Sequence, residues 1–169
     1  MPLREATPNQ TMAEIIDSMR IDKDLISIYI DKSQSLLQLR IDTTVLKTYP
    51  VVLGNNPVDD KRMEGDKCTP EGNFELKATY PHKKWSKFLW IDYPNAESWK
   101  KFNDAKEAGL LPATATIGGE IGIHGVPDGY DHLIDEKQNW TLGCISLKNK
   151  DVDEIYTVVK AGTKVQIVK

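Results

Sequence analysis

Apolar and polar residues alternate over two neighbouring stretches of this chain, and this pattern constrains the fold more than any other feature. The alternating apolar positions are Ile26, Ile28, Ile30, Leu37, Leu39 and Ile41. A period of two turns one side of each stretch toward a core and the other toward solvent. Because the polar residues 31–35 lie between the stretches, the pattern predicts a β-hairpin that begins an antiparallel sheet.

The rest of the chain adds short strands and few helices. Further strands are predicted at residues 45–53, 73–80, 87–93, 121–123, 145–147 and 163–168. Helices are predicted at 11–20, 96–108 and 149–162, with Thr11 and Asn149 as N-caps and Glu14 completing a capping box with Thr11. Since strands and helices do not alternate regularly, we predict a mainly β, largely antiparallel domain with helices at its edges.

Length and charge limit the possible functions. The chain has 169 residues, enough for one domain, which we place at residues 25–169 behind an N-terminal arm at 1–24. Its 22 basic and 25 acidic residues are well mixed and give a net charge of −3, so no nucleic-acid partner is expected. No apolar stretch approaches the ~20 residues of a membrane span, and residues 1–20 lack the apolar segment of a signal peptide.

Two reactive side chains each stand beside a glycine at the end of a short apolar run. His124 precedes Gly125, and Cys144 follows Gly143. A cysteine attacks as thiolate, and an imidazole within hydrogen-bond reach is a common way to form one. Gly143 would leave room for a carbonyl and for backbone N–H groups that stabilise an oxyanion. The pattern predicts a cysteine acyl-transfer enzyme.

Other interpretations of these residues remain open. Cys144 could be a small core residue and His124 a satisfied interior histidine. A zinc site built from His124, His132 and Cys144 has suitable ligand types, although the spacing matches no compact metal motif. Two cysteines are too few for a disulfide framework, and we expect Cys68 to be a free thiol outside the chemistry.

Four motifs follow one another along the chain: Gly-Asp-Lys-Cys-Thr-Pro-Glu-Gly at 65–72, Ile-His-Gly at 123–125, Thr-Leu-Gly-Cys-Ile at 141–145 and Gly-Thr-Lys-Val at 162–165. In this order, over residues 25–169, they resemble the L,D-transpeptidase catalytic domain family of bacterial peptidoglycan metabolism. The resemblance implies the family's largely antiparallel β-sandwich or sheet with a few peripheral helices. It also implies Cys144 as nucleophile, His124 as general base, the Gly125 carbonyl as support for the imidazole, and an oxyanion site around Gly143.

The chain departs from the common family pattern close to these motifs. Ser146 stands where a basic residue is usual. The charge-assisted hydrogen bond that a basic side chain could donate to a substrate carboxylate is therefore not expected at this position. Thr141, Trp140 and His132 complete the residues that we expect at a substrate or oxyanion site. His82 is interpreted as part of an exposed turn, and carboxylates at residues 128–136 as a possible attraction for a cationic amine.

The resemblance implies acyl transfer at the diaminopimelate–D-Ala bond of a tetrapeptide stem, through a thioester and without cofactor or metal. The implied partners are peptidoglycan stem peptides and carbapenem-type inhibitors, and the implied location is the periplasm or cell envelope. One alternative is an L,D-carboxypeptidase or related amidase that uses the same Cys and His. A non-enzymatic alternative is an inactive wall-binding module.

Overall fold

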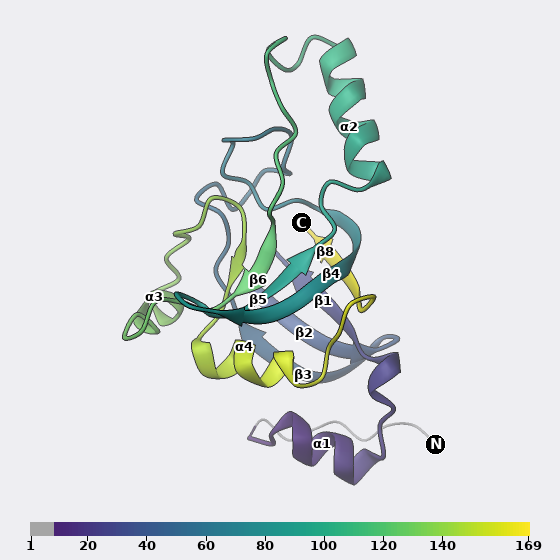
Figure 1. The fold of residues 1–169 in the computed structure, drawn as a ribbon, viewed down its shortest axis with the longest axis vertical. Coiled ribbons are helices and arrows are strands. Elements are labelled where there is room, and N and C mark those ends of the chain that lie inside the picture. The colour runs from purple at the N-terminus through teal and green to yellow at the C-terminus, as the bar shows by residue number, and fades with distance from the viewer. Residues whose placement is uncertain (1–8) are drawn as a thin grey trace.

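The computed structural model describes residues 9–169, and these residues form one eight-stranded sheet with the order β3-β2-β1-β8-β4-β5-β6-β7 (Figure 1). The strands are β1 (Ser27–Asp31), β2 (Leu36–Ile41), β3 (Thr44–Pro50), β4 (Gly72–His82), β5 (Ser86–Ile91), β6 (Gly122–His124), β7 (Ile145–Ser146) and β8 (Lys164–Val168). Within these residues, all neighbouring strands are antiparallel except the parallel pairs β1–β8 and β6–β7. The predicted mainly β, largely antiparallel class is confirmed.

The alternating stretches form the hairpin that the sequence predicts. Ile28 pairs with Leu39 and Ile30 with Leu37, and all four side chains are buried. The third strand is shorter than predicted, because it ends at Pro50 rather than residue 53. The next three side chains, at residues 51–53, are all buried, so this segment runs through the interior instead of along the sheet.

The segment after β3 returns to the far end of the sheet. Val52 donates its N–H to the Ser146 carbonyl and accepts the Ser146 N–H in return, both at 2.9 Å. These bonds form an antiparallel bridge on the side of β7 away from β6. The segment that follows β3, the first strand in the sheet order, is thereby hydrogen-bonded to β7, the last strand, next to the Cys144 motif.

Residues 9–169 contain four α-helices: α1 (Met12–Met19), α2 (Ala96–Glu107), α3 (His132–Asp135) and α4 (Asn149–Tyr156). The capping box at Thr11 and Glu14 is present as predicted, and Met12 of α1 is buried in the main core. The prediction for the last helix was wrong at both ends. Lys148 is its N-cap, and it ends at Tyr156, well before Gly162. Asn149 instead turns its side chain to accept the Val126 N–H at 2.9 Å.

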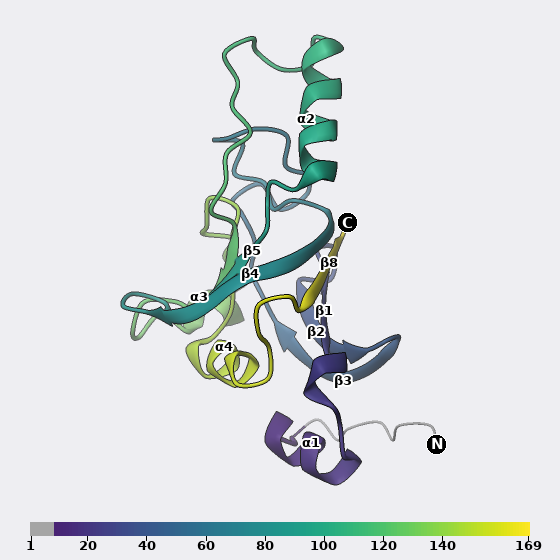
Figure 2. The ribbon, with the colours of Figure 1, turned by 45° about the vertical axis from the view of Figure 1, so that its right-hand side comes forward.

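Helix α2 belongs to an insertion that stands away from the sheet in both views (Figures 1 and 2). Its Phe102 is buried, whereas Trp99 is 46 % exposed. The segment between α2 and β6 is bonded to the loop before β4. Glu64 in that loop donates its N–H to the Thr116 carbonyl at 2.7 Å and accepts the Thr116 hydroxyl at 2.7 Å. This contact brings residues 118–121 to the Cys144 motif.

Candidate active site

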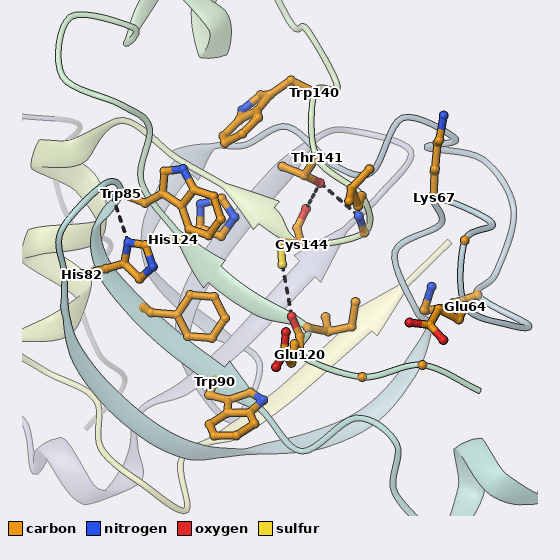
Figure 3. A pocket seen from close by; sticks show the side chains of 18 of the residues that line it. Glu64, Lys67, His82, Trp85, Trp90, Glu120, His124, Trp140, Thr141 and Cys144 are labelled. Atoms are coloured by element: carbon orange, nitrogen blue, oxygen red, sulfur yellow. Dashed lines mark hydrogen bonds between the residues drawn. The ribbon is translucent and has the colours of Figure 1, made fainter. Parts of the chain in front are cut away.

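His124 and Cys144 line the same cavity, which has a volume of about 830 Å³ (Figure 3). Its aromatic wall consists of Tyr80, His82, Trp85, Phe88, Trp90 and Trp140. Its charged residues are Lys61, Glu64, Lys67 and Glu120. A cavity of this size accepts a small molecule or a short peptide, and it combines an apolar side with charges of both signs.

His124 lies on β6 with 1 % of its surface exposed, and one backbone contact fixes its ring. The Nδ1 atom is 2.7 Å from the Gly125 carbonyl oxygen. Because a carbonyl only accepts hydrogen bonds, Nδ1 must carry the hydrogen, and Nε2 is then the basic nitrogen. Within residues 9–169, Nε2 has no hydrogen-bond partner, so it is available to accept a proton.

Gly125 and Ser146 form the support of this ring. The Gly125 N–H donates to the Trp85 carbonyl at 2.8 Å, and a Cβ at Gly125 would come within 2.0 Å of Asn149 Oδ1. The fully buried Ser146 donates its hydroxyl to the Gly125 carbonyl at 3.0 Å. Ser146 therefore contacts the support of the imidazole and does not line the cavity.

Cys144 ends a tight turn, residues 141–144, that side-chain hydroxyls hold in place. Thr141 donates its hydroxyl to the Cys144 carbonyl at 2.6 Å and accepts the Gly143 N–H at 3.2 Å. From the opposite side, Thr69 donates to the Gly143 carbonyl at 2.9 Å and accepts the Gly54 N–H at 3.0 Å. The position of the sulfur thus depends on contacts from three separate parts of the chain.

The backbone conformation and the packing at Gly143 both require a glycine. Its φ is +146°, which L side chains rarely adopt, and a Cβ there would lie 2.8 Å from the Cys68 carbonyl oxygen. The glycine allows close packing against the loop before β4, and it also lines the cavity, where space for an incoming carbonyl stays a prediction. Its N–H is already bonded to Thr141, whereas the Cys144 N–H has no partner within residues 9–169.

The Cys144 sulfur contacts the backbone of Gly122 in β6 and of Glu120 just before this strand. It accepts the Gly122 N–H at 3.4 Å and lies 3.5 Å from the Glu120 carbonyl oxygen, to which it donates (Figure 3). The sequence led us to expect a hydrogen bond to the imidazole, but within residues 9–169 the sulfur makes none to His124. The thiol proton is instead directed to the Glu120 carbonyl.

Burial keeps both side chains uncharged at neutral pH. It raises the pKa of the Cys144 thiol above its ordinary value, although the Gly122 N–H acts in the opposite direction. It lowers the pKa of His124 from 6.5 to about 4, against the opposing effect of the Gly125 hydrogen bond. The resting pair is therefore a thiol and a neutral imidazole, not a preformed thiolate–imidazolium pair.

The structure separates the other predicted site residues into two groups. Thr141 and Trp140 line the cavity, whereas the exposed His132 begins helix α3, lies tilted against the Tyr130 ring and is outside the cavity. Because His132 is outside, it does not join His124 and Cys144 as the zinc alternative requires. The carboxylates at residues 128–136 are also outside, and the cavity's own carboxylates are Glu64 and Glu120.

Of the aromatic wall, sequence reasoning identified only Trp140. His82 was interpreted as part of an exposed turn, but it is the last residue of β4 and its ring lines the cavity. Tyr80 pairs with Phe88 in the β4–β5 register, and Trp90 lies two positions further along β5. Aromatic residues at alternate positions on both strands of a hairpin share one face. That spacing is visible in the sequence and could have revealed this wall.

Cys68 is buried and unbonded to Cys144, since both cysteines are free. Burial raises the pKa of its thiol to about 11.

Across residues 9–169, no helix is both long and apolar enough to cross a membrane.

The chain is similar to known proteins in sequence pattern and in fold. A family model described as YkuD, L,D-transpeptidase catalytic domain, matches residues 26–167. Among solved structures, the helical cell shape determining protein Pgp2 from Campylobacter jejuni is 23% identical with a TM-score of 0.65, covering 86% of this chain and 48% of that one. Bd1075 from Bdellovibrio bacteriovorus is 19% identical with a TM-score of 0.60, covering 85% and 48%.

L,D-transpeptidase 3 from Mycobacterium tuberculosis, in complex with a faropenem-derived adduct, is 13% identical with a TM-score of 0.57, covering 86% of this chain and 60% of that one. At these identities the likeness establishes the fold. The chain spans about half the length of the first two structures. A search of curated proteins gave no significant match.

Proposed function

Since this chain belongs to the L,D-transpeptidase catalytic domain family, we propose that it catalyses acyl transfer on a peptidoglycan stem peptide, with Cys144 as nucleophile and His124 as general base. One observation carries the proposal. Cys144 lines a peptide-sized cavity together with an imidazole whose Nδ1 is bonded to the Gly125 carbonyl and whose Nε2 is unbonded. The proposed setting is the periplasm or cell envelope, where such a substrate is found.

The reaction begins from the neutral pair. As Cys144 Sγ attacks the amide carbon that joins diaminopimelate to the terminal D-Ala, its proton passes to His124 Nε2. The carbonyl oxygen becomes an oxyanion, for which the unpaired Cys144 N–H is the available donor. His124 then returns the proton to the D-Ala nitrogen, the C–N bond breaks, and the acyl group remains on Cys144 as a thioester.

A second nucleophile completes the cycle. An amine of another stem attacks the thioester carbon, loses its proton to His124 and regenerates the Cys144 thiol, which gives a crosslink. Water in the same role would give a trimmed stem, the reaction of an L,D-carboxypeptidase. Glu64 and Glu120 are the cavity carboxylates that would attract a cationic amine, and they support transfer over hydrolysis.

The test uses a defined disaccharide-tetrapeptide, with and without an excess of acceptor amine, and mass analysis of the products. We expect dimer from the parent protein and from Cys68→Ser, and no product from Cys144→Ala, in which a smaller side chain keeps the turn. Tripeptide alone at saturating acceptor would make the protein a carboxypeptidase. No product at all, and no covalent adduct of Cys144 with a carbapenem, would favour an inactive wall-binding module.

A further inference from the structure

The imidazole of His124 is packed among aromatic rings. The Trp85 ring stacks on it with centroids 4.1 Å apart and planes inclined by 19°. Phe88 lies nearly parallel at 6.0 Å, and Trp140 presents an edge-type contact at 5.6 Å and 69°. Trp85 therefore makes the closest of these ring contacts. Among the described residues, it is also the only tryptophan whose indole lies flat against the imidazole.

Backbone and side-chain contacts hold the Trp85 ring in this position. Trp85 lies in the turn between β4 and β5, and its N–H donates to His82 Nδ1 at 3.2 Å. The His82 ring also stacks on the indole, at 4.6 Å and 6°. The Trp85 carbonyl accepts the Gly125 N–H at 2.8 Å, so the turn is tied to the residue that supports His124.

The proposed reaction places a positive charge next to this indole. His124 must become an imidazolium whenever it takes a proton, in a site where burial works against a cation. The face of an indole carries partial negative charge and attracts a cation stacked upon it, more strongly than phenylalanine does. The other titratable groups at the ring are His82 on β4 and Cys144, with Lys61 and Glu120 further along the cavity.

We propose that Trp85 is a positioning residue that acts through His124, and that its indole face stabilises the imidazolium formed when His124 accepts the proton of Cys144. The inference rests on the proposed acid–base pair, although not on the identity of the acyl donor. A desolvated cation–π contact corresponds to about tenfold to thirtyfold in an equilibrium. Loss of the indole face is expected to slow proton transfer by a similar factor.

The test replaces Trp85 with tryptophans that carry one, two and three fluorine atoms, introduced at this single site. Fluorine weakens the negative face with little change of shape. We measure the rate of Cys144 alkylation by iodoacetamide at neutral pH, and the pKa of His124 by NMR. Both should fall stepwise along the series, to roughly a tenth in rate. The same series at the exposed Trp99 is the matched control and should change neither. Equal rates and an unchanged pKa across the Trp85 series would overturn the proposal.

Two further variants separate the π face from simple packing. Trp85→Phe and Trp85→Leu leave similar space, but only phenylalanine presents an aromatic face. Alkylation should be faster in the Phe variant, and the fluorine series should be flat in a His124→Ala background. Equal rates for Phe and Leu, or a fluorine effect without His124, would refute a role through the imidazole. Fluorine-dependent alkylation in a protein that does not process stem peptides would support the role of Trp85 and overturn the proposed function instead.

Discussion

Lys32 is a buried cation at the base of the Cys144 turn, and its removal should destabilise the protein strongly. Its side chain is 1 % exposed and its Nζ donates to three acceptors: the Asp59 carbonyl at 2.9 Å, the Thr69 carbonyl at 2.8 Å and the Glu71 carboxylate at 2.9 Å. Lys32→Met keeps most of the side-chain length but removes every one of these bonds. The Glu71 carboxylate and two carbonyls then lose their common donor.

The magnitude follows from burial of the pair. Removing one partner of a buried ion pair costs about 3–5 kcal/mol, since the other charge stays uncompensated. For a domain of this size that corresponds to a fall in Tm of roughly 6–20 °C. Because Thr69 also holds the Gly143 carbonyl, the Cys144 turn should loosen as well. Alkylation of Cys144 in the folded variant reports that change.

The assay is urea unfolding at neutral pH, with thermal unfolding in parallel. Lys160→Met is the matched control, because Lys160 pairs with Asp24 on the surface with both side chains about two-thirds exposed, and such solvent-screened pairs contribute little to stability. The double variant Lys32→Met with Glu71→Met should recover part of the loss, since no charge is then stranded. A loss below about 1 kcal/mol in Lys32→Met alone would refute the reasoning from burial.

Three other predictions follow from the site. Alkylation of Cys144 should keep accelerating as pH rises past about 9, because burial raises the pKa of this thiol above its ordinary value; a rate plateau between about pH 6 and 8 would indicate a preformed thiolate. The free energy of unfolding should fall as pH drops from 6.5 to about 4, since only the unfolded state protonates His124 in that window. Urea titrations at several pH values should show a smaller fall in His124→Gln, and an identical fall would contradict the lowered pKa. Cys68→Ser should retain the alkylation rate of Cys144, and a peptide map showing iodoacetamide on Cys68 in the native parent would contradict its raised pKa of about 11.

Local sequence signals predicted the parts of the fold that depend on neighbours along the chain. The capping box needs only Thr11 and Glu14, three positions apart, and both of its hydrogen bonds are present. The β1–β2 hairpin likewise follows from alternation on either side of a polar turn. The two short strands beside the reactive side chains also followed from apolar runs next to a glycine, since β6 ends at His124 and β7 begins directly after Cys144.

Contacts between distant segments were not predictable in this way. Asn149 has the side chain of an N-cap, but Val126 offers it an unpaired N–H, and the cap passes to Lys148. The Cys144 thiol also contacts the backbone of residues 120 and 122 rather than the imidazole. This contact depends on the path of the segment between α2 and β6. Such outcomes are decided by which backbone groups the tertiary fold leaves without partners.

The bridge between Val52 and Ser146 has a consequence for how a peptide can approach Cys144. A strand at the edge of a sheet normally offers free N–H and C=O groups, and many proteins bind extended peptides by adding them as a further strand. Here β6 covers one side of β7, and Val52 occupies both backbone groups of Ser146 on the other. The strand that follows Cys144 therefore has no free ladder to extend. A peptide that reaches Cys144 is not expected to add a strand to β7, and its selection should depend more on the aromatic and charged walls of the cavity than on pairing with this strand.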